Sequence, residues 1–446
     1  MTHNYPSTIE DLTNGDVADD SYNQYKRDVE MMRELGLQFY RFSLSWPRIL
    51  PTGFPNKLNE PGIQYYNNLI DEMLKYNIEP MITLYHWDLP QRLQELGGWA
   101  NPHIADWFAD YARVAFENYG DRVKYWITIN EPYDLCAPGY GDGFAAPMVV
   151  SKGIGEYMCA KNLLIAHSKA YHIYDKEFRY KTKGIIGISL SAKWHEPESE
   201  DDTEIADHMR QFQFGQFAHP IFSENGDFPP IMKEKIATKS AEQGFSRSRL
   251  PEFTADEIKL LKGSADFLGL NHYTTQIIRQ DASATYDVPS FWDDIGGTTY
   301  QLDEWESTAS PWLKVVPWGF YKILNKIKET YDNPTIIITE NGLPTFGGLD
   351  DDNRVAYLRS YIGAMLDAMD DGCNIIGYAA WSLMDNFEWI YGYRVRFGLY
   401  EVDHTSPNRT RTPRKSAFVY KEIVRTRTLD TSYEPDTNLM TIDEGH

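Results

Sequence analysis

Apolar runs of strand length alternate with amphipathic segments of helix length along most of the chain. Runs rich in β-branched and aromatic residues predict seven strands, over residues 38–46, 79–87, 124–132, 184–192, 265–273, 335–342 and 375–383. Several runs are continuously apolar, which is typical of parallel strands that are covered on both faces. Helical spacing of apolar residues predicts helices over 20–35 and 60–74. This alternation, without a linker or an internal repeat, predicts one large α/β domain over residues 1–425.

The candidate functional residues of these strands fall within the apolar runs or at their C-terminal ends. In a barrel of parallel strands those ends meet on one face, where active sites are built, whereas an open sheet binds ligands only at a switch point. Because nearly every strand contributes, we expect a (β/α)8 TIM barrel. Only seven strands are visible and no strand pattern precedes residue 20, so we expect the first strand to be missing from this chain. The residues at the strand ends are Arg41, His86, Asn130, Glu131, Asn271, Tyr273, Glu340 and Trp381.

The remaining segments carry weaker patterns. Residues 193–260 and 279–310 predict long loops with some helix, and residues 426–446 predict a disordered tail. The cysteines, Cys136, Cys159 and Cys373, are far apart in the sequence. An odd and sparse set is not a disulfide framework and has no metal-ligand spacing. We therefore expect three small core residues and no metal site.

Composition and charge narrow the functional classes. Lys and Arg total 43 against 65 Asp and Glu, which gives a net charge of −22 without a basic stripe. Nucleic-acid binding requires the opposite sign, so we do not expect it. No apolar run is long enough to span a bilayer, and the polar start MTHNYPSTIED has no signal-peptide pattern. The chain as it stands is expected to be cytoplasmic, whereas a full-length relative is expected to be secreted.

Glu131 and Glu340, at the tips of KYWITINEP and TIIITENG, are the strongest pair for catalysis. Two facing carboxyl groups about 5–5.5 Å apart cleave a glycosidic bond with retention of configuration, one as nucleophile and the other as acid and then base. Arg41 and Tyr273 suit the ionised partner, because a cation and a phenol stabilise negative charge. The pair therefore indicates glycoside hydrolysis.

Other polar and aromatic residues suit the binding of a sugar. Taken singly, each has an ordinary structural explanation, because a Glu at a strand end is most often a solvated terminus and a tryptophan is most often a core residue. The functional interpretation depends on all of them sharing one predicted face. The candidates for binding sugar hydroxyls and for stacking on a sugar ring are His86, Asn130, Glu388, Trp381 and Trp389.

Segments in all parts of the chain resemble the glycoside hydrolase family 1 β-glucosidases, in the same order. They are YRFSLSWPRILP (40–51), TLYHWDLP (83–90), TINEP (128–132), NHY (271–273), ITENG (338–342) and WSLMDNFEW (381–389). The similarity extends from about residue 14 to about residue 425, and VPWGFYKIL resembles the animal, insect-like branch. The resemblance implies a (β/α)8 barrel and retaining hydrolysis of a small β-glucoside or short oligosaccharide, without metal or cofactor.

The resemblance also implies a role for each matching residue. Glu131 would be the acid/base and Glu340 the nucleophile, which Arg41 and Tyr273 would hold. A plant-type thioglucosidase would carry Gln in place of Glu131. A phospho-glycosidase would lack the carboxylate of Glu388, which repels phosphate, so we expect unphosphorylated glucose, with galactose or fucose tolerated. The residues implied to bind substrate are His86, Asn130, Asn271, Trp381, Glu388 and Trp389, with Trp312 at the aglycone lip.

One departure keeps alternatives open. Family members open with a strand ending in a Gln that contacts the sugar, and this chain has neither. A missing strand leaves two sheet edges unpaired, so a truncated, inactive family member is one alternative. A non-catalytic sugar-binding relative is another, although such relatives typically lack one of the two carboxylates. An open-sheet oxidoreductase lacks its main support, since no GxGxxG follows a strand.

Overall fold

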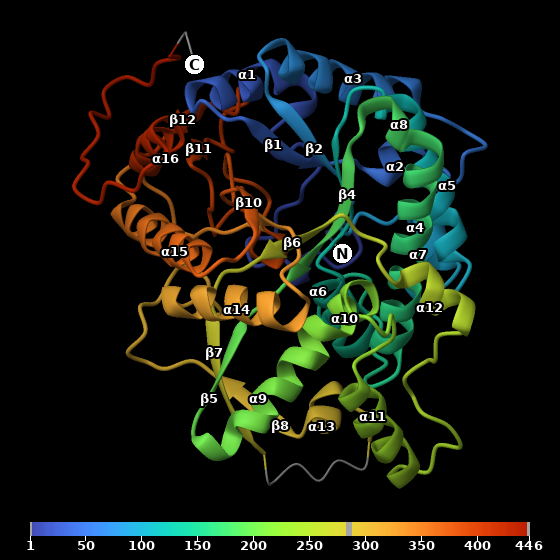
Figure 1. Cartoon of the computed structure of the whole chain (residues 1–446). Helices are drawn as coiled ribbons and strands as arrows, with labels where there is room; N and C mark the ends of the chain where they lie inside the picture. The colour runs from blue at the N-terminus through green and yellow to red at the C-terminus, as the bar shows by residue number, and fades with distance from the viewer. Residues whose placement is uncertain (1, 282–287, 444–446) are drawn as a thin grey trace.

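Seven parallel strands form one curled sheet with helices around it (Figure 1). The computed structural model describes residues 2–281 and 288–443, and the strand order over these residues is β1-β2-β3-β4-β6-β9-β10. Each strand lies within one of the seven runs that the sequence predicts, so that prediction is confirmed. The strands are β1 (Phe39–Ser43), β2 (Glu79–Tyr85), β3 (Tyr125–Asn130), β4 (Ile185–Ser191), β6 (Phe267–Asn271), β9 (Ile336–Glu340) and β10 (Ile375–Tyr378).

Helices follow most of these strands and cover the outer face of the sheet (Figure 1). The predicted helices over 20–35 and 60–74 are α1 (Ser21–Glu34) and α3 (Glu60–Lys75). Gly36 ends the first of them with a left-handed φ of +67°, which a glycine adopts without strain. The other helices are α2 (Trp46–Ile49), α4 (Gln91–Glu95), α5 (Ile104–Tyr119), α6 (Pro132–Cys136), α7 (Gly155–Ile173), α8 (Arg179–Thr182), α9 (Thr203–Arg210), α10 (Gln216–Phe222), α11 (Pro230–Glu242), α12 (Ala255–Leu261), α13 (Phe291–Ile295), α14 (Pro317–Thr330), α15 (Asp352–Asp370) and α16 (Lys415–Thr426).

Apolar side chains fill both faces of the sheet. A large cluster lies between the strands and the helices, and it includes buried residues of nearly every helix. A small inner cluster, formed by Met81, Ile127, Phe267 and Ile337, takes one side chain from each of β2, β3, β6 and β9. Burial on both faces explains why the predicted strands are apolar along most of their length.

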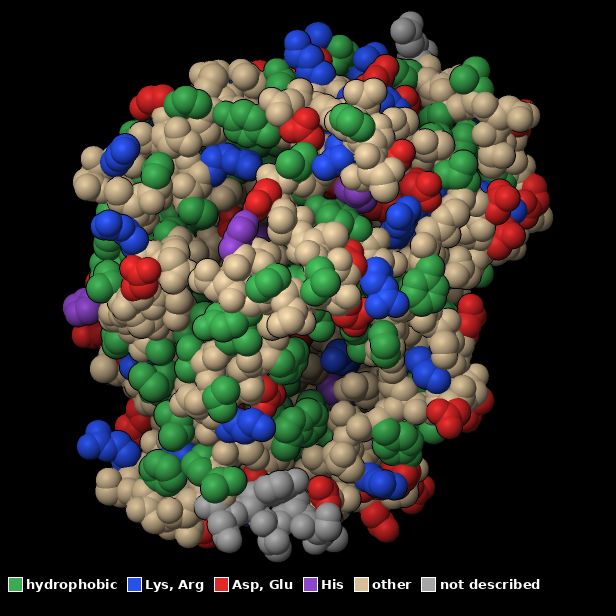
Figure 2. All heavy atoms as spheres, turned by 180° about the vertical axis from the view of Figure 1, so that it is seen from behind, with side chains coloured by type: hydrophobic (Ala, Val, Ile, Leu, Met, Phe, Trp, Pro, Cys, Tyr) green, Lys and Arg blue, Asp and Glu red, His purple; other side chains and the backbone are tan. Residues whose placement is uncertain are grey.

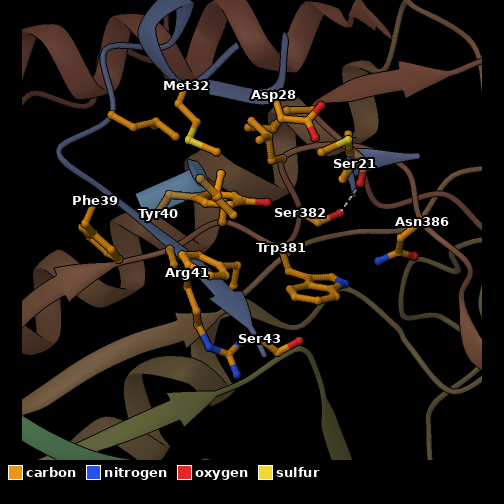
Figure 3. A pocket seen from close by; sticks show the side chains of 18 of the residues that line it. Ser21, Asp28, Met32, Phe39, Tyr40, Arg41, Ser43, Trp381, Ser382 and Asn386 are labelled. Carbon is orange, nitrogen blue, oxygen red and sulfur yellow. Dashed lines mark hydrogen bonds between the residues drawn. The ribbon is translucent and has the colours of Figure 1, made fainter. Parts of the chain in front are cut away.

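The sheet has a gap between β1 and β10. None of the described residues forms a strand there, and every residue of β1 is only half buried, whereas β6 and β9 are buried throughout. A cavity of about 330 Å³ lies at this gap. Figure 3 shows the side chains of Arg41, Ser43 and Trp381 at one end of the cavity and that of Met32 at the other. Among the described residues the main sheet therefore has the seven strands that the sequence predicts.

The loop prediction for residues 193–260 and 279–310 is wrong in part. A small second sheet contains β5 (Trp194–Pro197), β7 (Thr275–Gln280) and β8 (Gly297–Tyr300), and it lies apart from the main sheet in Figure 1. These strands are short, and β5 pairs with a strand about eighty residues further along the chain, so no local pattern marks them. A hairpin of β11 (Tyr400–Val402) and β12 (Arg411–Pro413) is also separate. Residues 282–287 of the predicted loop lie outside the described residues.

The expectation that all three cysteines are unlinked is also wrong. Cys136 at the end of α6 and Cys159 in α7 form a disulfide, with Cα atoms 5.6 Å apart, and both are buried. Cys373 is a free, buried thiol, as expected. The pairing depends on how α6 and α7 pack, and a separation of 23 residues gives no sign of it.

The C-terminal tail beyond α16 has no helix or strand over residues 427–443, and residues 444–446 lie outside the described part. Lys415 pairs with Glu434 of the tail at 2.8 Å, and Arg359 donates to the carbonyl of Tyr433. The disorder predicted for residues 426–446 therefore stays a prediction.

The surface agrees with a mixed charge distribution. Figure 2 shows acidic and basic side chains interspersed over one face of the molecule, without a continuous basic patch on that face. Within residues 2–281 and 288–443, no helix combines the length and the apolar character needed to cross a membrane.

Candidate active site

Glu131 lies at a sharp corner between β3 and α6. Its φ of +44° is left-handed, an unusual conformation for a residue with a side chain, and Pro132 then begins the helix. The pairing of β3 with β4 shifts register between Ile127 and Asn130, and the amide of Glu131 donates to the Ser189 carbonyl at 2.9 Å. Bulges of this kind redirect side chains. The strained corner therefore sets the direction of the Glu131 carboxyl.

Glu340, the last residue of β9, is buried, and both of its carboxyl oxygens accept hydrogen bonds. Nη1 of Arg41 donates to Oε1 at 2.6 Å, and the hydroxyl of Tyr273 donates to Oε2 at 2.7 Å. A cation and a phenol together stabilise the ionised form of a carboxyl group. The structure thus brings Arg41 and Tyr273 to the residue that the sequence paired with them.

Tyr273 is itself held in place from behind. Its carbonyl accepts hydrogen bonds from the hydroxyls of Tyr357 at 2.9 Å and Tyr361 at 3.0 Å, both on α15. Burial, followed by the charges of Glu340 and Glu131, raises the pKa of Tyr273. Its phenol therefore stays protonated and remains a donor.

Glu131 has a different environment from Glu340. Its Oε1 accepts a hydrogen bond from Nδ2 of Asn271 at 2.7 Å, and no cation contacts it among the described residues. Burial, together with the negative charges of Glu340 and Asp134, raises the pKa of Glu131 well above the ordinary value of a glutamate. A pair of carboxyl groups whose environments differ in this way suits one acid and one nucleophile.

Asn130 and His86 form the floor beside the two carboxyl groups. Oδ1 of Asn130 accepts from Nη2 of Arg41 at 2.6 Å and from Nδ2 of Asn271 at 3.1 Å, and its Nδ2 lies 3.1 Å from Nε2 of His86. Burial and the nearby Arg41 lower the pKa of His86 to about 3, so its ring is neutral. Neutral imidazole and amide groups offer both donors and acceptors, which sugar hydroxyls require.

Tryptophans and one further carboxyl group complete the site. The rings of Trp381 and Trp389 stack on His86 with centroids 6.0 and 5.9 Å away. Trp312 packs edge-on against Tyr273 at 5.6 Å. Burial and the charge of Glu340 raise the pKa of Glu388, just before Trp389, to about 8. The structure therefore brings all of the sequence candidates together around the C-terminal ends of the parallel strands.

Gly342, in the TENG segment, shows why that segment ends in glycine. A Cβ at this position would lie 1.9 Å from the carbonyl oxygen of Trp381, and Trp381 donates its amide to the Asn341 carbonyl at 2.8 Å. Only glycine permits this close approach of two backbones. The contact holds Trp381 beside Glu340.

Sequence reasoning missed several polar residues around the site. Asp134 follows Glu131 by one helical turn, and Trp87 donates its indole N–H to the Asn130 carbonyl at 2.8 Å. Three buried hydroxyl residues were also missed. Each is a polar residue inside an apolar strand, which was the available signal, but nothing in the sequence shows which partner each one contacts. The missed hydroxyl residues are Thr83, Ser189 and Thr339, each buried.

The cavity at the gap lies beside the site and not between its two carboxyl groups. It is lined by Arg41, His86 and Trp381, but neither Glu131 nor Glu340 lines it. The carboxyl pair and the gap are therefore neighbouring features, and Arg41, His86 and Trp381 belong to both.

Comparison with known proteins identifies the family. The sequence pattern of Glycosyl hydrolase family 1 matches residues 1–429. A cytosolic β-glucosidase of Cavia porcellus is 42% identical over 96% of this chain and 92% of its own length. The structure of aphid myrosinase has a TM-score of 0.90 at 47% identity, covering 95% of this chain and 92% of that one. A rice β-glucosidase mutant in a covalent complex with Glc has a TM-score of 0.88 at 36% identity, covering 94% and 91%.

The solved relatives imply a (β/α)8 TIM barrel, which agrees with the curled parallel sheet of this chain. The relatives with assigned activities include β-glucosidases, and one of them carries a sugar. Since the family pattern spans nearly the whole sequence, the chain belongs to glycosyl hydrolase family 1 and is a glycoside hydrolase that acts on a small-molecule sugar substrate.

Proposed function

We propose that the protein is a retaining β-glucosidase in which Glu340 is the nucleophile and Glu131 is the acid/base. The observation that carries the proposal is the contrast between the two carboxyl groups. Both oxygens of Glu340 accept hydrogen bonds from Arg41 and Tyr273, whereas Glu131 has a raised pKa and receives a single amide donor. The covalent sugar complex of the rice relative supports the same chemistry.

The reaction follows from these two environments. A carboxylate oxygen of Glu340 attacks the anomeric carbon while Glu131 gives its proton to the departing glycosidic oxygen, and the aglycone leaves as an alcohol. Glu131, now ionised, takes a proton from water, whose oxygen attacks the same carbon and releases Glu340. Two inversions give net retention of configuration.

Substrate choice follows from the remaining groups. The amide of Asn130, the imidazole of His86 and the carboxyl of Glu388 suit sugar hydroxyls, and Trp381 offers an apolar surface to the ring. A phosphorylated sugar would bring its negative charge close to that of Glu340, which already raises the pKa of Glu388. We infer a glucose-like, unphosphorylated glycone.

The test is time-dependent inactivation by a 2-deoxy-2-fluoro-β-glucoside with a dinitrophenolate leaving group, read by intact mass and peptide mapping. We expect one fluoroglucosyl group on Glu340, none on Glu340→Gln, and normal labelling of Glu422→Gln, a control in the Arg425 ion pair of α16. Folded protein without any label would overturn the proposal for this chain. Labelling only of a longer chain that supplies an eighth strand would identify the present chain as the inactive, truncated alternative.

A further inference from the structure

A chain of hydrogen bonds links Asn130 and His86 to polar side chains of neighbouring strands. Arg41 determines which atom donates and which accepts at each step. A guanidinium can only donate, so the Asn130 atom 2.6 Å from Nη2 of Arg41 must be the amide oxygen. The amide nitrogen of Asn130 then points to Nε2 of His86, 3.1 Å away, which must accept. His86 therefore carries its proton on Nδ1.

The same argument fixes the next amide. The Asn271 atom 3.1 Å from the Asn130 oxygen must be a donor, so it is Nδ2, and it also donates to Oε1 of Glu131 at 2.7 Å. The amide oxygen of Asn271 accepts from the Thr339 hydroxyl at 2.6 Å. With its proton used in this way, Thr339 can only accept from the Ser189 hydroxyl, 3.0 Å away. Every direction in the chain is thus determined.

We propose that Thr339, with Ser189 behind it, is a positioning residue that holds the amide of Asn271 so that its nitrogen faces Glu131. Neither hydroxyl lies among the groups proposed to bind sugar, and both residues are buried, Ser189 on β4 and Thr339 on β9. The inference rests on the proposed role of Glu131 as the acid/base.

The orientation of Asn271 decides which oxygen of Glu131 carries the acidic proton. Because Oε1 accepts the amide N–H, a protonated Glu131 holds its hydrogen on Oε2, where it is free for the leaving group. A reversed amide would present its oxygen instead, accept the acidic hydrogen and divert it from the substrate. The Thr339 hydroxyl opposes this reversal, because it requires an acceptor at its own end of the amide.

The charged and titratable groups around Glu131 come from several elements. They are Glu340 of β9 and Asp134 of α6, whose charges raise its pKa, and Arg41 of β1, whose charge lowers it. Tyr273, after β6, is also near. Donation by Asn271 favours the ionised form of Glu131, so losing it moves the pKa of Glu131 further upward.

Thr339→Val tests the proposal, because it keeps the branched shape and removes only the hydroxyl. We expect kcat/KM for an alkyl β-glucoside, which needs acid assistance, to fall by about 10-fold or more, because part of the rate gained from general acid catalysis is lost. For dinitrophenyl glucoside, whose leaving group needs no proton, we expect a change of less than about 3-fold. The basic limb of the pH profile should move to higher pH.

Matched variants separate positioning from a general loss of packing. Thr339→Ser keeps the hydroxyl and should restore both the substrate ratio and the pH profile. Thr128→Val is the control, since Thr128 is also buried in a strand but its hydroxyl bonds Nδ1 of His167 on α7 at 2.7 Å. Ser189→Ala, one step further from Asn271, should show the same effect in weaker form.

The outcomes distinguish this proposal from the proposed function. If Glu131→Gln fails to slow the alkyl glucoside more than the dinitrophenyl glucoside, the role of Glu131 is wrong. If Glu131→Gln does so but folded Thr339→Val slows both substrates equally and leaves the basic limb unmoved, only the positioning role is wrong.

Discussion

The two sides of the sheet differ in what holds them. On the closed side, β2, β3, β4, β6 and β9 each pair with a strand on both edges, and most of their residues are buried. On the open side, β1 and β10 each pair on one edge only among the described residues, and Ile376 of β10 is 56% exposed. Edge strands exchange and fray more readily than central ones.

The chemistry is divided between these two sides. The closed side carries Glu131, Asn271 and Glu340, the groups that we propose to move protons and attack the sugar. The open side supplies Arg41, which reaches across the sheet to Glu340, and Trp381, which follows β10. The two carboxyl groups that we propose to react therefore lie on the closed side with Tyr273, whereas Arg41 and Trp381 contact the site from the side where the sheet is open.

The largest expected effect is in hydrogen exchange along β1. The hydrogen bonds from Glu79 N to the Gln38 carbonyl and from Leu44 N to the Thr83 carbonyl fix the alternation of this parallel ladder. The amides of Tyr40 and Phe42 then face β2, and that of Arg41 faces the gap. We expect Arg41 to exchange at least about 100-fold faster than Tyr40, read residue by residue by NMR or fragment mass spectrometry.

Equal protection of these two amides would contradict the expected difference between the paired edge and the free edge of β1. It would show that the free edge of β1 is paired in solution by another segment or by a second molecule.

A matched pair of isoleucines on neighbouring strands tests the same difference in stability. Ile338 of β9 is fully buried, whereas Ile376 of β10 is mostly exposed. Ile338→Ala should lower the free energy of unfolding by about 2–5 kcal/mol, because it opens a cavity in the core. Ile376→Ala should change it by no more than about 0.5 kcal/mol, as for other surface positions. Urea unfolding followed by tryptophan fluorescence measures both, and similar losses would mean that β10 is covered in solution.

The disulfide gives the closed side a second support. It joins α6, which follows Glu131, to α7, whereas Cys373 just before β10 has no partner cysteine. Replacing both Cys136 and Cys159 by Ala should lower the unfolding free energy by about 3 kcal/mol, the value for a loop of this length. Cys373→Ala serves as the control. A double variant as stable as the wild type would mean that the disulfide does not stabilise the closed side of the sheet.

The pH dependence of stability tests the environment of Glu388 on the open side. Its pKa is raised from 4.5 to about 8 by burial and by the charge of Glu340, so the folded state holds the proton more tightly than the unfolded chain. This contribution to stability is fully present below about pH 4.5 and is lost as the pH rises towards about 8. Glu388→Gln should therefore unfold with a flatter pH dependence between pH 5 and 8. Identical slopes in the wild type and the variant would place Glu388 in contact with solvent.

Much of the site was available from the sequence because each key residue lies in or just after an apolar strand. KYWITINEP and TIIITENG mark both carboxyl groups, and parallel strands bring their C-terminal ends together whatever the detailed packing. The same logic finds Arg41 and Tyr273. By contrast, Thr339 and Ser189 read as ordinary strand residues, because their importance depends on the donor and acceptor directions of side chains from other strands.

The sequence by itself determined the seven strands, the order in which they follow one another, and the residues at their tips, since periodicity and strand length are local properties. Only the tertiary structure decided the small sheet of β5, β7 and β8, the disulfide between Cys136 and Cys159, and the hydrogen-bond partners of Thr339 and Ser189. Each of these depends on contacts between residues far apart in the chain, and long-range contacts leave no signature in the local pattern of apolar and polar positions.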